Sequence, residues 1–169
     1  MGTMKKRRSF EPGHHRKFLI IVDGSQESEA ALYYAAGRIR HTSGSIVLLY
    51  VIEPQDFQHW MGVRDVHIEE ETNKAKAMFR LFRRKLGLEG SKDVTIEEIV
   101  REGKKAEEII SLVNEDEDIA ILVLGAAADA KGPGPLVSDL ASGSTAGQYP
   151  IPITIVPGNL TVEEIEALA

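Results

Sequence analysis

Short apolar runs alternate along the chain with longer segments of helical periodicity. The runs lie at residues 18–22, 46–52, 94–100, 119–124 and 151–156, and each is followed by glycine, proline or a charged residue. Runs of this length, rich in β-branched residues, predict strands. The alternating run 94–100 predicts a strand near a sheet edge. The most continuous run, 119–124, predicts a central strand that is buried on both faces.

The segments between and after these runs predict helices. They lie at residues 26–41, at 68–86, at 106–113, in the stretch before Pro150, and from Thr161 onward. Ser25 or Ser28 is the expected N-cap of the first helix. Thr161 and Glu164 form a capping-box pattern for the last. Residues 54–63, which include Trp60, show no regular apolar pattern. We expect them to form an irregular loop that could close over a binding pocket.

Strands that alternate with helices in this order predict an α/β fold. We expect an open, doubly wound, parallel five-stranded sheet with helices on both faces and a short C-terminal helix. In such Rossmann-like sheets, ligands bind at the carboxyl ends of the strands, at the point where the strand order reverses. We therefore expect ligand-binding residues at the carboxyl ends of the strands.

Composition and charge narrow the classes of function. A chain of 169 residues suits one domain, which we assign to residues 17–169. Residues 1–16 form a basic segment that we expect to be disordered, with an arm for nucleic acid or acidic membrane as the alternative. The net charge of −6 argues against a general nucleic-acid binder. No apolar run is long enough to span a membrane, and the absence of cysteine is consistent with a cytoplasmic location.

Two strand ends, Val22-Asp23-Gly24-Ser25 and Leu124-Gly125-Ala126, point to a family. Together with Leu48-Leu49-Tyr50-Val51-Ile52, Gly103 and Pro150-Ile151-Pro152, they make the chain resemble the universal stress protein family over roughly residues 17–157. The resemblance implies the sheet order 3-2-1-4-5. It also implies a homodimer that pairs through the last strand, here residues 152–156, and an adenine-nucleotide site with AMP or ATP as the candidate ligand.

The resemblance places the nucleoside contacts on Asp23, Val51 and Gly125. A carboxylate at a strand end can accept hydrogen bonds from a ribose or an adenine, and a glycine allows a close backbone approach. Asp23 alone could equally be a turn or cap residue. The family's phosphate loop, Gly-x2-Gly-x9-Gly-Ser/Thr, departs here after its first glycine. Its remaining positions are occupied by Ala128, Ser138 and Asp139.

The sequence gives little support for a metal site, another nucleotide-binding motif or a hydrolase active site. The five histidines lack zinc-ligand spacing, so no metal site is expected, and no P-loop, dinucleotide fingerprint or catalytic triad is present. We therefore expect a regulatory or binding module, with the nucleoside half of the site retained and the phosphate half eroded, so that ATP binds weakly or not at all. The alternative is an ATP- or AMP-binding protein with weak nucleotide hydrolase activity.

Overall fold

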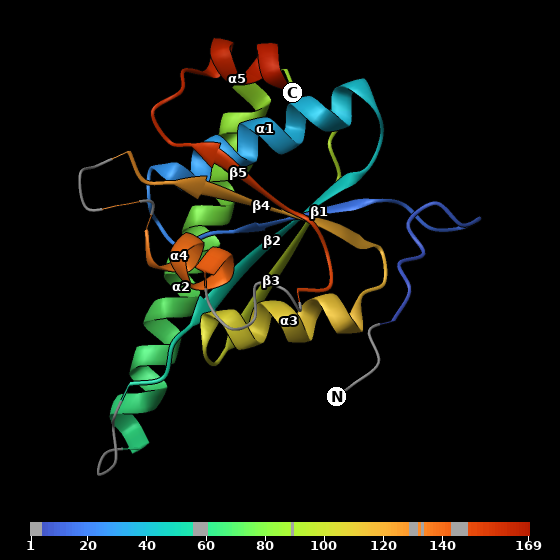
Figure 1. The fold of residues 1–169 in the computed structure, drawn as a ribbon. Helices are drawn as coiled ribbons and strands as arrows, with labels where there is room; N and C mark the ends of the chain where they lie inside the picture. Colours follow the sequence, from blue (N-terminus) through green and yellow to red (C-terminus); the bar gives the residue numbers. More distant parts are fainter. Residues whose placement is uncertain (1–4, 56–60, 89, 129–131, 133, 143–148) are drawn as a thin grey trace.

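The computed structural model describes residues 5–55, 61–88, 90–128, 132, 134–142 and 149–169. Strands and helices alternate along the chain (Figure 1). The elements are β1 (Lys17–Ile21), α1 (Glu27–His41), β2 (Ser45–Ile52), α2 (Met61–Leu88), β3 (Ile96–Glu102), α3 (Lys105–Glu115), β4 (Ile119–Ala126), α4 (Pro135–Ser142), β5 (Ile153–Pro157) and α5 (Val162–Leu168).

The five strands form one parallel sheet in the order β3-β2-β1-β4-β5. This confirms the predicted α/β fold and its strand order. The chain winds outward from β1 through β2 to β3, then returns to the other side of β1 with β4. The reversal therefore lies between β1 and β4, whose carboxyl ends carry Asp23 and Gly125.

Two apolar layers cover the sheet because successive strand side chains point to opposite faces. In β1, Phe18 and Ile20 pack in the layer with α1, α2 and α5, whereas Leu19 and Ile21 pack in the layer with α3 and α4. Every residue of β2 is buried for the same reason. The helices that join β1 to β2 and β2 to β3 thus share one face, and the later pair shares the other.

The long helix α2 buries the face that its periodicity predicted. Ala75, Phe79, Phe82 and Leu86 are buried against the sheet and α1 layer, and the outer face is charged. The helix begins at Met61, so it takes over part of the segment that was expected to be a loop. Among the described residues, no helix combines the length and the apolar character needed to cross a membrane.

The two predicted helix caps have different outcomes. The capping box of α5 is confirmed, because Thr161 Oγ1 accepts from Glu164 N and the Glu164 carboxylate accepts from Thr161 N. The prediction that Ser25 or Ser28 caps α1 is wrong. Gln26 occupies the N-cap position without a side-chain cap, and the Ser25 hydroxyl instead donates to Asp23 Oδ1 at 2.6 Å. Ser25 therefore stabilises the turn before α1 and does not cap the helix.

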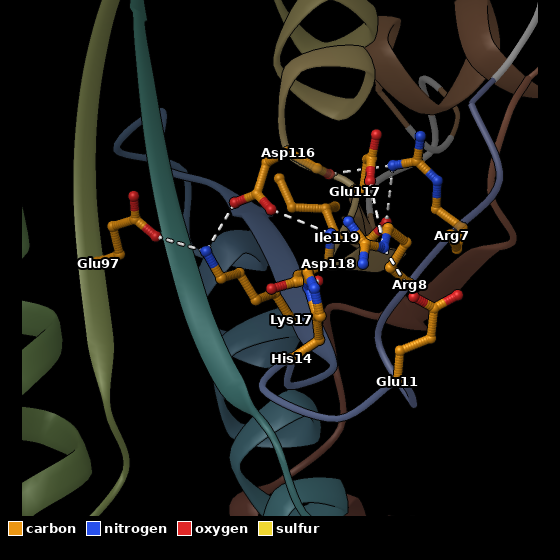
Figure 2. A network of polar contacts seen from close by, with 10 residues as sticks. All are labelled: Arg7, Arg8, Glu11, His14, Lys17, Glu97, Asp116, Glu117, Asp118 and Ile119. Atoms are coloured by element: carbon orange, nitrogen blue, oxygen red, sulfur yellow. Dashed lines mark hydrogen bonds and ion pairs between the residues drawn. The ribbon is translucent and has the colours of Figure 1, made fainter.

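Residues 5–16, which we call the N-terminal strap, pack along the amino ends of β1 and β4 (Figure 2). The Arg7 guanidinium donates to three backbone carbonyls at the end of α3 and the start of β4, those of Val113 (2.6 Å), Asp116 (3.0 Å) and Ile119 (3.3 Å). Arg8 N donates to Glu117 O at 3.0 Å. His14 Nδ1 lies 2.6 Å from Asp118 Oδ1. The strap thus meets the acidic run 115–118.

These contacts differ from the disordered basic tail that composition alone predicted for residues 1–16. The last turn of a helix carries unpaired carbonyls and a partial negative charge, and both favour a guanidinium at that position. The acidic residues that follow α3 add to this attraction. Residues 1–4 lie outside the described part of the chain.

Gly125 brings β4 and the first turn of α1 into direct backbone contact. A Cβ atom at this position would lie 1.8 Å from the carbonyl oxygen of Glu27, well inside any real contact distance. The glycine is therefore required by the packing of α1 across the sheet reversal. The sequence pointed to a close approach of this glycine to a ligand, and the structure adds a close approach to the backbone of α1.

We expect Arg7→Ala to lower the free energy of unfolding by about 1–3 kcal/mol, because it leaves partly buried carbonyls without their donor. Chemical denaturation monitored by circular dichroism measures the change. Arg8→Ala is the matched control, since the contacts of its side chain with described residues are surface ion pairs with Glu11 and Glu117, and such pairs contribute little. Equal stability of the Arg7 variant and the wild type would show that the strap does not stabilise the fold.

We expect Gly125→Ala to destabilise the protein by about 1–3 kcal/mol or more, because the added methyl group forces α1 away from β4. The control is Gly62→Ala in α2, where an added Cβ meets nothing within 4 Å. There alanine should be neutral or stabilising by up to about 1 kcal/mol. Thermal melts of both variants measure the effect, and a Gly125→Ala protein as stable as the wild type would contradict the packing argument.

Candidate functional site

Two adjacent hollows lie at the carboxyl ends of the strands, on either side of the end of β1. The β1–β4 hollow, of about 160 Å³, opens between β1, β4 and the starts of α1 and α4. The β1–β2 hollow, of about 180 Å³, opens between β1, β2 and α2. Asp23 and Lys105 line both hollows. The two hollows therefore form one site at the predicted strand reversal.

Asp23 holds the turn between β1 and α1 and is exposed to the site at the same time. Its Oδ1 accepts hydrogen bonds from Ser25 N at 2.9 Å and from Ser25 Oγ at 2.6 Å. Among the hydrogen bonds between described residues, none involves Oδ2. Gly24, with φ of +78°, allows the tight turn that follows. The turn role and a ligand-binding role thus fall on different oxygens of one carboxylate.

The β1–β2 hollow has a polar wall contributed by β2 and α2. Tyr50 Oη donates a hydrogen bond to Glu71 Oε2 at 2.5 Å. Burial, and then this hydrogen bond, raise the pKa of the Tyr50 hydroxyl above its ordinary value. Tyr50 therefore remains a neutral donor, and it fixes the Glu71 carboxylate at the edge of the hollow. Val51 lines the same hollow from the adjacent position of β2.

The structure brings together three of the six predicted positions. Asp23 and Gly125 line the β1–β4 hollow, and Asp23 and Val51 line the β1–β2 hollow. The other three lie elsewhere: Ala128 is exposed after β4, and Ser138 and Asp139 are exposed on α4. None of these three is among the described lining residues of either hollow.

The end of the loop before α4 reaches the β1–β4 hollow through Gly134. Gly132 and Gly134 have φ values of +104° and +101°, a conformation that favours glycine. Gly134, Leu136 and Val137 line the hollow. Trp60 lies outside the described residues.

Sequence reasoning missed Lys105, the lysine that lines both hollows. It is the first residue of α3 and follows the turn at Gly103, where φ is +150°. It lies three residues after the end of β3, so the rule that ligands bind at the carboxyl ends of strands could have found it, but the resemblance pointed to the first, second and fourth strands. Glu53 directly follows β2 and could have been found in the same way, whereas Glu27 and Glu71 come from α1 and α2, whose packing brings them to the site.

Carboxylates dominate the charge of the site. Asp23 and Glu27 line one hollow, and Glu53 and Glu71 line the other with Asp23. The cationic groups among the described lining residues are Lys105 and, when protonated, His67. Such a site offers many acceptors for hydroxyl and amino groups of a ligand. It repels a group that carries several negative charges.

Several proteins of known structure have a fold similar to this one. The universal stress protein UspA from Lactobacillus plantarum superposes with a TM-score of 0.65 at 16% identity, over 83% of this chain and 97% of that one. A universal stress protein in complex with cAMP gives a TM-score of 0.57 at 16% identity, over 83% and 96% of the two chains. The protein from Archaeoglobus fulgidus in complex with dAMP gives 0.54 at 14% identity, over 84% and 98%.

Comparison of sequences identifies the family. Among curated proteins, none matches the chain. The model of the Universal stress protein family matches residues 14–157, which include every strand of the sheet and both hollows at its carboxyl end. The protein therefore belongs to the universal stress protein family.

Proposed function

We propose that the protein is a regulatory or binding module that binds an adenine nucleoside or AMP at the two hollows and binds ATP weakly or not at all. The observation that carries the proposal is the position of Asp23. Its Oδ1 is held by the turn and its other oxygen is directed to no described partner, between two hollows at the strand reversal. A ribose or adenine supplies the hydroxyl or amino donors that such an acceptor needs.

Related folds support an adenine ligand. Two of the universal stress proteins with this fold were solved in complex with cAMP and with dAMP. Both ligands carry adenine, a sugar and a single phosphate group. Lys105, at the shared wall of the two hollows, is suited to meet one such phosphate.

The charge around the hollows disfavours a triphosphate. A carboxylate about 4 Å from a phosphate costs roughly 4 kcal/mol at an effective dielectric constant near 20. Four carboxylates line the two hollows, and the loop that carries phosphate contacts in the family has Ala128, Ser138 and Asp139 at its motif positions. Each additional phosphate therefore adds more repulsion than one lysine offsets.

A second copy of the chain is the partner that we propose. β5 is an edge strand, and Ile155 on it is 43% exposed. A groove of about 360 Å³ beside it is lined by apolar residues such as Leu140, Ile151 and Ile153. Edge strands that expose apolar side chains pair with another strand or aggregate. Pairing of residues 152–156 about a two-fold axis covers the strand and the groove together.

We expect calorimetry to give binding of adenosine and AMP, with ATP at least about tenfold weaker than AMP, a difference of roughly 1.4 kcal/mol. Asp23→Ala should weaken adenosine binding by about tenfold, because it removes one charged acceptor. Asp93→Ala, an exposed aspartate at the amino end of β3, is the control of equal charge. A tight Mg²⁺–ATP complex, or phosphate release from it, would favour the nucleotide-hydrolase alternative.

Light scattering should show a dimer of the wild-type protein at micromolar concentration, and Ile155→Lys should convert it to monomer or to insoluble protein. A charge at the edge strand opposes pairing because it would have to be buried there. Leu81→Lys on α2, at a position of 44% exposure, is the matched control and should leave the dimer intact. A stable wild-type monomer would contradict the proposed interface.

A further inference from the structure

A third cavity, which we call the strap cavity, lies at the opposite end of the sheet from the two hollows. It has a volume of about 640 Å³, larger than either hollow. This volume lies within the range of about 300–1,000 Å³ that is typical of small-molecule sites. Its walls are the N-terminal strap, the turn between α1 and β2 at residues 43–45, and the start of β3.

Part of the outer wall lies beyond the region that the family model matches. Ser9 and Phe10 line the cavity, and the match to the family begins only at residue 14. The strap is held in place by the hydrogen bonds of Arg7 to α3 and β4 (Figure 2). Two of the residues that line the cavity thus lie outside the matched region, and the others lie within it.

The charged groups that line the strap cavity differ in whether a carboxylate is paired with them. Lys17 is neutralised by Asp116 and by Glu97, the acidic residue among the described lining groups, at 2.7 and 3.1 Å. His14, the remaining titratable lining group, is paired with Asp118 at 2.6 Å. Arg16 makes no ion pair with a described carboxylate.

The Arg16 guanidinium is only partly satisfied by its neighbours. Nη2 donates to Thr42 Oγ1 at 2.5 Å and to Ser43 O at 3.3 Å. Nε is buried without an acceptor among the described residues. Burial, followed by repulsion from Arg38, lowers the pKa of Arg16. A guanidinium beside a second cation, with no carboxylate to balance it, attracts an anion.

An aromatic ring lies beside this cation. The Arg16 guanidinium carbon lies 4.8 Å from the centre of the Phe18 ring and 5.9 Å from that of Phe10. Phe18 is buried, whereas Phe10 is 83% exposed at the rim of the cavity. An exposed ring of this size offers a face on which another flat ring can stack. Cation and aromatic face therefore occur side by side.

We propose that the strap cavity binds a small anion that carries an aromatic ring, with the anionic group at Arg16 and His15 and the ring against Phe10. Ser9, Ser43 and Thr95 also line the cavity, and their hydroxyl groups are further candidate donors to the anion. The site is distinct from the nucleoside site, which lies at the other end of the strands. It does not depend on the proposed function.

The test uses phenyl phosphate, which combines one anionic group with one ring, in titrations of the full-length protein followed by NMR. We expect phenyl phosphate to bind more tightly than either inorganic phosphate or phenol. Arg16→Gln should weaken phenyl phosphate binding by at least about tenfold, since it removes the charge that holds the anion. Arg80→Gln on the exposed face of α2 is the control of equal charge change and should leave binding unchanged.

Phe10→Ala keeps the test decisive if Arg16→Gln does not fold, because the Phe10 side chain is almost fully exposed. It should weaken phenyl phosphate binding several-fold and leave the binding of inorganic phosphate unchanged. Binding that is unaffected by Phe10→Ala would overturn the proposal. So would displacement of phenyl phosphate by adenosine, or equal weakening by Arg80→Gln.

Discussion

The backbone contact between Gly125 and Glu27 is the constraint on which the arrangement of the site depends. It lets the first turn of α1 lie directly against the end of β4, at the point where the strand order reverses. Asp23, in the turn that precedes α1, lines both hollows at this reversal. A larger residue at position 125 would push α1 outward and open the β1–β4 hollow, which both segments line.

The helix dipoles favour anionic groups at the carboxyl ends of the strands and cationic groups at the amino ends, and the side chains follow this polarity only in part. In a parallel α/β fold the helix N-termini lie at the carboxyl ends of the strands, where they favour anionic side chains. Glu27 begins α1, and Glu107 and Glu108 lie in the first turn of α3. At the other end, Arg38 lies in the last turn of α1 and Arg7 binds the carbonyls that end α3. The acidic run 115–118 lies at the same end, so Arg7 is held there by nearby carboxylates as well as by the unpaired carbonyls.

Much of the fold was predictable because strands and amphipathic helices are recorded in local hydrophobic patterns. The runs 18–22 and 119–124 became the adjacent strands β1 and β4, and the periodic face of α2 became buried as expected. The strand order came from the family resemblance and is confirmed by the pairing of β1 with β2 and β4. The cap of α5 was correct because both partners of a capping box lie within four residues.

The sequence by itself determined the elements, their order along the chain and the place of Asp23 at the end of the first strand, since each depends on residues that are near one another in the chain. Only the tertiary structure decided that Lys105 lines both hollows, that Ala128 and Asp139 lie outside them, and that the N-terminal strap binds the end of α3. These outcomes depend on contacts between distant segments. Their energies arise from charge and close packing in three dimensions, which no local pattern records.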